Sequence, residues 1–421
     1  MSYFFRIPSI LVIIGSLCFA EEAAPALTPA KAVVLALRFN RDLAAARYAI
    51  QQGEGRLKQA GLLPNPEFEL SHESDRLIRN EGEYNLSVGF KQRFPITGRL
   101  ANEKAVARVD VALAMAEVRN QERLLAGEVM ARSREWLVAR ERLRANRETL
   151  ATIQKLTDAT EKRLQVAEGS AADVNLTKIE AEKVNLAQGL LLSQQEVAGI
   201  ELNSLLGRDP KALVELSGNI STDMNTGEMA ADSRQAIARR PDRQMAALGI
   251  NRAAAELVLA RSGKWEDWTV GFGYSRAVGK FGDPIGTKTD DLIGISLSIP
   301  LPLWNKNGGK ISEAEATRQR NEAELDALEL RILTEIQSAE TQMRRQQAIL
   351  RQYRQVSLKL AEDNMALLQK GYNDGLNGIT NVIQAQQQFA ELRQSYLEAV
   401  GEFLRAKTAW ETATGAVLPR K

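Results

Sequence analysis

The sequence predicts a mainly α-helical chain with a membrane β-barrel portion, built from one helix–strand–strand–helix–helix plan that occurs twice. Three observations predict this fold class. Residues 100–167 and 311–370 contain no proline and almost no glycine, which favours long helices. Four short runs alternate apolar with small or polar side chains, which is typical of strands. The turn-forming residues of the first half also recur roughly 205 residues later, as expected of an internal repeat.

The N-terminal residues have the pattern of a secretory signal. Arg6 precedes an apolar run over residues 7–17, and the small residue Ala20 stands at the expected cleavage site. The run is too short to span a bilayer, which takes about 20 apolar residues. Cys18 is the only cysteine, and Leu17 before it does not suit an acylation site. We therefore expect a signal peptide over 1–20, with acylation or removal of Cys18 left open.

Charge and motif content indicate no enzyme and no nucleic-acid partner. The chain carries 55 basic and 53 acidic side chains, interspersed, for a net charge of +2. The one histidine, His72, lies on an expected strand and has no cysteine to share a metal with. The sequence contains neither a phosphate-binding glycine loop nor a nucleophile elbow. We therefore expect no cofactor, no catalytic residue and no metal site.

The repeat divides the chain into two similar halves. Phe94-Pro95 and Ile299-Pro300 each end an expected strand and are followed by a glycine-containing turn and a long helix. The expected organisation is a signal peptide over 1–20, a first repeat over 21–206 with strands at about 66–76 and 84–94, a linker over 207–232, a second repeat over 233–414 with strands at about 267–277 and 291–300, and a tail over 415–421.

The strands favour a membrane sheet. Each is close to the 9–11 residues that a tilted membrane strand requires, although a soluble sheet buried on one side would alternate in the same way. Large aromatic side chains decide between these readings, because they gather at the strand ends that meet on one side of an up-and-down sheet. Such a belt is typical of the membrane–water interface. The expected interface aromatics are Phe94, Trp265, Trp268 and Trp304.

Four strands are too few to close a barrel, and open strand edges are unsatisfied in lipid. Other subunits must complete the sheet, and three copies would supply twelve strands. The helices are equally incomplete alone. Each long stretch could reach on the order of 100 Å, and heptad-like apolar spacing marks the helices that return from the turns, such as Leu186 and Leu190. We expect these helices to build a coiled-coil wall without chemistry of its own.

Several motifs then suggest a family. Over the whole mature chain the duplicated plan resembles the TolC-type outer-membrane efflux factors. Residues 63–70 (LPNPEFEL), 94–99 (FPITGR) and 299–309 (IPLPLWNKNGG) are most similar to its cobalt–zinc–cadmium (CzcC-like) metal-efflux branch. The resemblance implies a homotrimer in outer-membrane lipid, with a 12-stranded barrel above a helical tunnel that crosses the periplasm. It also implies two partners, a periplasmic adaptor and an inner-membrane pump.

The resemblance further implies site residues at the periplasmic tip. The family's two tip turns hold a glycine against which the adaptor docks, and a turn of this kind needs a residue that tolerates positive φ. Its tunnel narrows just beyond, often at acidic residues, where this chain has two amides and one carboxylate. The docking residues are Gly169, Gly375 and Leu376, and the periplasmic gate residues are Asp173, Asn381 and Gln384.

The function that the sequence predicts is a passive, gated exit duct of a tripartite pump that extrudes heavy-metal cations. Selection of the metal and the supply of energy would rest with the pump and the adaptor. The first alternative is the same duct used for drugs, organic compounds or type I protein secretion. The second is a soluble periplasmic coiled-coil scaffold with a small sheet and no channel.

Overall fold

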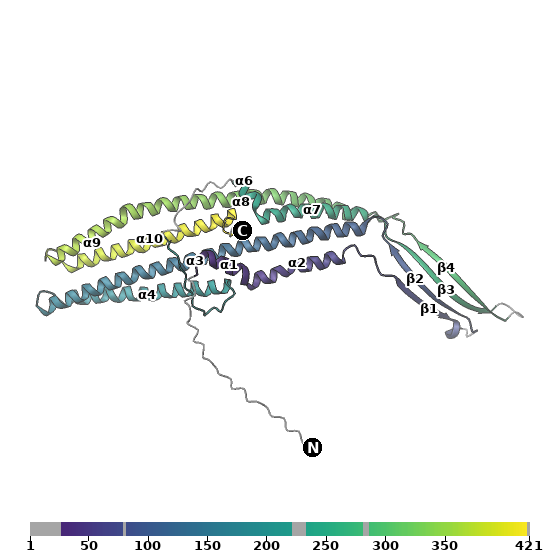
Figure 1. Ribbon diagram of the computed structural model, residues 1–421, viewed down its shortest axis with the longest axis horizontal. Helices are drawn as coiled ribbons and strands as arrows, with labels where there is room; N and C mark the ends of the chain where they lie inside the picture. The colour runs from purple at the N-terminus through teal and green to yellow at the C-terminus, as the bar shows by residue number, and fades with distance from the viewer. Residues whose placement is uncertain (1–26, 79–80, 221–232, 281–285, 419–421) are drawn as a thin grey trace, which may run out of the picture.

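The protein is an elongated molecule in which a long helical body carries a four-stranded sheet at one end (Figure 1). The computed structural model describes residues 27–78, 81–220, 233–280 and 286–418. The expected signal peptide with Cys18, and residues 221–232 of the expected linker, lie outside the described residues.

Both halves of the chain contain the same order of elements. The first half contains α1 (Pro29–Phe39), α2 (Arg41–Gln59), β1 (Glu67–Ser74), a short 3₁₀ turn (Asp75–Leu77), β2 (Tyr84–Phe94), α3 (Arg99–Gln165) and α4 (Ala171–Leu205). The second half contains α6 (Ser233–Arg239), α7 (Pro241–Ser262), β3 (Trp268–Lys280), β4 (Thr287–Ser298), α8 (Gly308–Gln352), a π-helical turn (Tyr353–Ser357), α9 (Leu358–Asn373) and α10 (Ile379–Thr414). The predicted fold class, mainly helical with four strands per chain, is confirmed.

The second long helical stretch is continuous, as expected, but contains one irregular turn. Residues 311–370 are helical throughout, and the π turn Tyr353–Ser357 joins α8 to α9 with helical φ and ψ on both sides. A π turn of this kind is a rare single-turn bulge inside an α-helix. The turn contains neither proline nor glycine, so nothing in its composition predicts it.

The four strands form one antiparallel sheet in the order β1-β2-β3-β4. β4 starts at Thr287, earlier than expected, because its polar first residues pair with the end of β3, Lys280 opposite Thr287. The hydrophobic alternation marks only the apolar part of a strand, so it misses such polar extensions. β4 ends at Ser298, two residues before Pro300, which has no N–H for a ladder.

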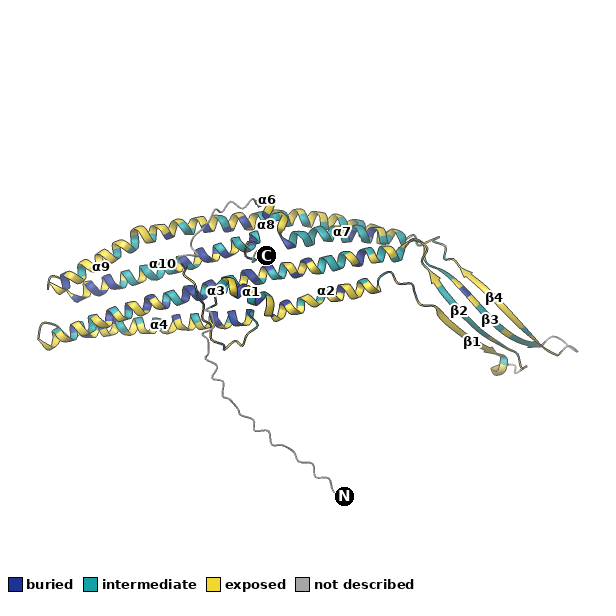
Figure 2. Cartoon of the chain, in the orientation of Figure 1, coloured by how far each residue is buried: buried dark blue, intermediate teal, exposed yellow. Residues whose placement is uncertain are grey.

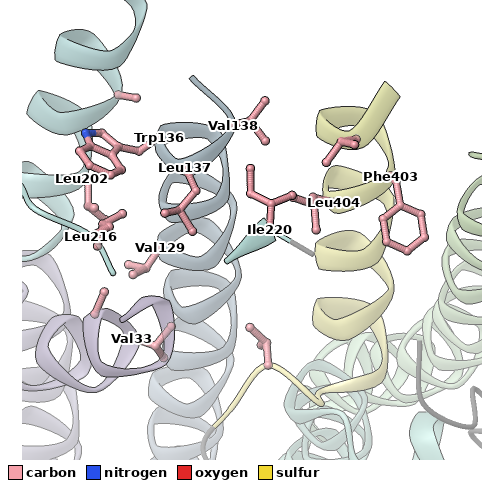
Figure 3. Packing of buried hydrophobic residues seen from close by; sticks show 14 of the residues in the cluster. Val33, Val129, Trp136, Leu137, Val138, Leu202, Leu216, Ile220, Phe403 and Leu404 are labelled. Carbon is pink, nitrogen blue, oxygen red and sulfur yellow. The ribbon is translucent and has the colours of Figure 1, made fainter. Parts of the chain in front are cut away.

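The main core lies midway along the helical body, where α1 and the segment over 208–220, here called the strap, cover one face of α3 (Figure 3). Trp136 and Leu137 of α3 pack there against Leu216 of the strap and Val33 of α1. The guanidinium of Arg140 secures the strap, donating to the carbonyl oxygens of Leu216 and Gly218 at 2.8 Å each.

A buried charged junction joins the two repeats where α10 ends. The guanidinium of Arg240 donates to Asp242, to Glu335 and to the carbonyl oxygen of Ala413. Arg123 of α3 donates to the adjacent carbonyl oxygen of Thr412, so two guanidiniums cap one helix C-terminus. Burial raises the pKa of Asp242, but the hydrogen bond and charge of Arg240, with the charge of Arg123, outweigh it and leave that pKa lowered.

The four long helical elements form a single layer in the order α4, α3, α10 and α8–α9. α3 packs between α4 and α10, and α10 packs between α3 and α8–α9, while α4 and α10 barely touch. The layer therefore has two free edges, one on α4 and one on α8–α9, just as the sheet has free edges on β1 and β4.

Both free edges of the helical layer are apolar. On α4 the exposed apolar residues are Ile179, Leu186, Leu190 and Val197. On α8, the π turn and α9 they are Ile349, Val356, Leu360 and Leu367. The two sets have the same spacing along the chain, which is the heptad-like spacing of coiled-coil seams. We call them the α4 edge stripe and the α9 edge stripe.

Among the described residues, none of the helices has both the length and the apolar composition that crossing a bilayer requires.

Candidate functional site

The periplasmic-tip residues predicted from the sequence gather where the two helical hairpins, α3–α4 and α9–α10, make their turns (Figure 1). Ala167 and Gly375 lie at these two turns, and Gly207 and Gly415 lie just after α4 and α10. The two members of each pair are the same number of residues apart, and all four residues have positive φ. The repeat therefore aligns Ala167, rather than Gly169, with Gly375. The expectation that Gly169 supplies the positive φ of the first turn is wrong.

The two glycines serve different physical needs. A Cβ on Gly169 would lie 3.2 Å from the backbone nitrogen of Leu164 and 3.3 Å from the Cβ of Arg163, so this position needs a small residue for space. Gly375 has open space around it but a φ of +74°, so it needs conformational freedom instead. Leu376 follows it with 80% of its surface exposed, and Gly375 and Leu376 form an accessible apolar tip.

The predicted gate residues lie on the first turns of the helices that leave the tip. Asp173 completes a capping box with Ser170: the Ser170 N–H donates to its carboxylate at 3.3 Å, and its own N–H donates to the Ser170 hydroxyl at 3.2 Å. Asn381 is the corresponding residue of α10, and it is exposed, as is Gln384 one turn later. The carboxylate of Asp173 therefore has a structural role at the start of α4, which the amides do not share.

Sequence reasoning missed a contact that joins the two hairpins. The guanidinium of Arg163 on α3 lies 4.5 Å from the ring centroid of Tyr372 on α9, and it donates to the Tyr372 carbonyl oxygen at 3.4 Å. Hydrogen bonding to Tyr372 raises the pKa of Arg163, and an arginine is protonated at physiological pH in any case, so the positive charge of this contact does not vary with pH there. No local sequence pattern predicts this contact, because its two residues are distant in the chain and each is an ordinary helix residue.

Two further contacts lie behind the first. An apolar cluster joins Tyr372 to Ile379 and Val382, with Leu156 of α3 and Leu176 of α4 packed against it. Farther from the tip, the amide of Gln387 on α10 donates to the buried carboxylate of Glu180 on α4 at 2.6 Å. The two hairpins are thus held together at their tips by a small number of side chains.

The predicted interface aromatics lie at the end of the sheet that adjoins the helices. Phe94 and Trp268 are directly opposite each other in the β2–β3 ladder. Trp265 precedes β3, and Trp304 follows β4 with 92% of its surface exposed. Beyond this belt one face of the sheet exposes large apolar side chains, including Ile295 at 82%.

The opposite face of the sheet is lined by small and paired polar residues. Gly89, Gly273 and Gly294 lie side by side across three strands. The Ser71 and Ser87 hydroxyls are hydrogen-bonded at 2.6 Å in the next cross-strand row. The longer side chains on this face are the exposed Leu292, opposite Ser275, and ion-paired residues at both ends of the sheet, such as Lys91 with Glu69 and Lys288 with Asp290. The sheet thus has one apolar surface and one surface of mainly small and polar residues, here called the smooth face.

Within the described residues, no group of three or more His, Cys, Asp or Glu side chains is arranged to hold a metal ion. What the tip and the sheet offer in this part of the chain are exposed surfaces and the contacts that join the two hairpins.

Comparison with known proteins agrees with this architecture. The family model described as "Outer membrane efflux protein" matches residues 32–208 and 233–416, which is most of both repeats. The chain belongs to the outer membrane efflux protein family. The resemblance inferred from the sequence motifs is thereby confirmed, as is the expected location in the outer membrane. Membership also sets aside the alternative of a soluble periplasmic scaffold.

Individual relatives of this outer membrane efflux protein cover almost its whole length. The cobalt-zinc-cadmium resistance protein CzcC of Cupriavidus metallidurans is 22% identical over 94% of this chain and 92% of its own. The pyoverdine export outer membrane protein OpmQ of Pseudomonas putida is 25% identical over 87% and 83%.

Solved structures have the same fold. The structure of CusC superposes with a TM-score of 0.76 at 18% identity, covering 92% of both chains. The open state of the MtrE outer membrane channel of Neisseria gonorrhoeae gives 0.73 at 16% identity, covering 92% of this chain and 88% of that one.

Proposed function

We propose that this outer membrane efflux protein is the passive, gated exit duct of a tripartite pump that extrudes heavy-metal cations, acting as a homotrimer. The full-length similarity to the cobalt-zinc-cadmium resistance protein supports the metal substrate. The architecture of the chain supports the rest of the proposal, since both of its layers are open and need partners of the same kind.

The trimer is supported by the free edges of both layers. The α4 edge stripe and the α9 edge stripe have matching spacing, so each can pack against the other stripe of the next subunit. The sheet is also open at β1 and β4, whose outer edges carry unpaired backbone groups. Because β1 and β4 run in opposite directions, β4 of one copy can pair with β1 of the next in an antiparallel ladder. Three copies would then close a barrel of about twelve strands.

The exposed faces of the sheet fit a membrane channel. The apolar face would contact outer-membrane lipid, and the interface aromatics Phe94, Trp265, Trp268 and Trp304 would lie at its periplasmic boundary. The smooth face lined by Gly89, Gly273 and Gly294 would surround a water-filled lumen. Small inward residues leave that lumen wide, so the barrel would conduct without selecting.

The periplasmic tip would hold the gate and the docking surface. Asn381 and Gln384, with Asp173, would line the constriction, and the contact of Arg163 with Tyr372 would hold it closed. The adaptor would dock against the turns, at Gly169 and at Gly375 with Leu376. Neither a cofactor nor a catalytic residue is required, since the inner-membrane pump and the adaptor would supply energy and selection.

A second candidate is export of organic molecules, which the similarity to the pyoverdine export protein favours. One experiment separates the two. The gene is deleted in its own bacterium and restored on a plasmid, and growth is measured in graded cobalt, zinc and cadmium while siderophore release into the medium is quantified. Metal sensitivity that the plasmid reverses supports the metal duct. Unchanged metal tolerance with lost siderophore release would replace it with the second candidate.

A further inference from the structure

One face of α10 stays exposed along its length. Because α10 lies between α3 and α8–α9, it is away from both free edges of the helical layer, and joining subunits at those edges would not cover it. Its exposed residues recur every three, four or seven positions, so they form one line along the helix. This line, here called the α10 stripe, consists of Asn381, Gln384, Gln388, Glu391, Glu398, Glu402 and Arg405.

The α10 stripe lies on the bare face of the layer, opposite the strap and α1. On the covered face, Tyr396 and Val400 of α10 line a hollow with Ile220 of the strap. On the bare face, Arg405 lines a groove of about 440 Å³ between α4, α3 and α10. When three copies of the layer curve into a tube, the outer circumference is larger than the inner one. The face that carries the added layer of α1 and the strap is the bulkier of the two, so it fits the outside of the tube. The bare face then lines the lumen. Figure 2 shows that exposed and buried residues alternate along α10.

Most charges on the α10 stripe are neutralised. Arg142 donates to Glu398 at 2.8 Å, and Arg405 lies 3.3 Å from Glu402. Glu391 has neither an ion pair nor a hydrogen bond with any residue that the structure describes. The positions three and four residues away on α10 are uncharged: Gln387, Gln388, Gln394 and Ser395. Arg393, the nearest cation on the same helix, is ion-paired with Glu148 of α3 instead.

The helices on the α3 side of α10 do not offset this charge. On α4, Lys183 is the residue that the repeat aligns with Glu391, and its ammonium lies 3.8 Å from the Glu180 carboxylate. On α3, Asn146 and Thr149 are buried and neutral. Lys183 is therefore matched by Glu180, and the carboxylate of Glu391 remains unpaired on this side of the helix.

We propose that Glu391 is the selectivity-determining residue of the duct, forming a ring of three carboxylates inside the tunnel. Seven residues, or about 10 Å of helix, separate it from the Gln384 amide at the constriction. The Asn381 and Gln384 amides at the constriction favour neither sign of charge, and the Asp173 carboxylate beside them already accepts the Ser170 N–H. The unpaired Glu391 carboxylates, by contrast, raise the local concentration of hydrated cations. The duct would then favour cations over anions at this ring, which lies behind the gate, and not at the gate itself. This inference rests on the proposed trimeric duct.

The test is the reversal potential of single channels in planar lipid bilayers under a KCl gradient, which gives the ratio of cation to anion permeability. Glu391→Gln is compared with Glu362→Gln, a matched control. Glu362 is an exposed carboxylate of α9 that lines the hollow with Ile220 on the strap side. Both variants are first shown to be trimers with wild-type thermal stability.

We expect Glu391→Gln to lower the permeability ratio several-fold, Glu391→Lys to favour anions, and Glu362→Gln to behave as wild type. The difference between Glu391→Gln and wild type should shrink in 1 M salt, because screening shortens the reach of the ring. Wild-type channels whose ratio is the same with Glu391→Gln, or lowered equally by Glu362→Gln, would overturn this inference while keeping the duct. Wild-type protein that never conducts would overturn the duct itself.

Discussion

The apolar edges of the helical layer make a quantitative prediction about assembly. Leu186 and Leu190 belong to the α4 edge stripe and expose 66% and 70% of their surfaces in the single chain. If each packs against the α9 edge stripe of the next subunit, most of that surface leaves water. The perturbation is the double substitution Leu186→Gln and Leu190→Gln, which keeps helix propensity and removes apolar burial.

The magnitude follows from the exposed fractions. Full burial of a leucine side chain contributes about 1.5–3 kcal/mol. With about two thirds of each side chain covered on assembly, each substitution costs about 1–2 kcal/mol, and the pair about 2–4 kcal/mol per interface. A closed trimer has three such interfaces, so the total approaches about 6–12 kcal/mol. That loss is large enough to lower the temperature at which trimers dissociate.

The assay is the fraction of trimer against temperature in mild detergent, followed by size-exclusion chromatography with light scattering. Leu213→Gln is the control, because Leu213 is also an exposed leucine, at 85%, but belongs to the strap. We expect the double variant to dissociate at clearly lower temperature and the control to match wild type. A double variant with the wild-type dissociation temperature would refute the reasoning that these stripes face each other between subunits.

Three further predictions concern stability, measured by thermal unfolding of the detergent-solubilised protein. Ala167→Gly should stabilise the first tip turn by about 1 kcal/mol and Gly375→Ala should destabilise the second by about as much, since both positions have positive φ; equal signs would contradict this. Gly127→Val should cost at least about 1–3 kcal/mol, because a Cβ there would clash with α10; a wild-type melting temperature would contradict the close helix approach. Arg240→Ala should cost up to about 3–5 kcal/mol, because it removes a buried guanidinium that pairs with Asp242 and Glu335 and leaves Asp242 with only the more distant Arg123 guanidinium, at 3.7 Å. Because its folded pKa is lowered, the stabilisation that Asp242 provides is present above about pH 4 and is lost as pH falls through that folded pKa; acid stability unchanged by Arg240→Ala would argue against this.

The tip residues show what a family motif predicts correctly and what it does not. The sequence located both turns, because helices end where the apolar period stops and glycine or serine follows. It placed the positive φ on Gly169 because glycine is the usual residue there, whereas the backbone puts it on Ala167. Only the folded backbone distinguishes a glycine needed for space from one needed for conformation, since the residue type is the same in both.

Local periodicity is what the sequence by itself determined. Strand alternation, helix length, the two-fold repeat and the aromatic belt are all set by residues close together in the chain, and they sufficed for the fold class and for the family. The expected need for further subunits also followed, because the number of strands can be counted without knowing how they pack.

Only the tertiary structure decided which faces meet. Three features depend on which helices are neighbours and which side the strap covers: the contact of Arg163 with Tyr372, the matching edge stripes and the unpaired charge of Glu391. A helix with a weak amphipathic pattern does not specify its neighbours, so the same residues could face the lumen, a subunit interface or the core. Packing between distant segments selects among these, and the energy of that packing is spread over contacts that no short stretch of sequence contains.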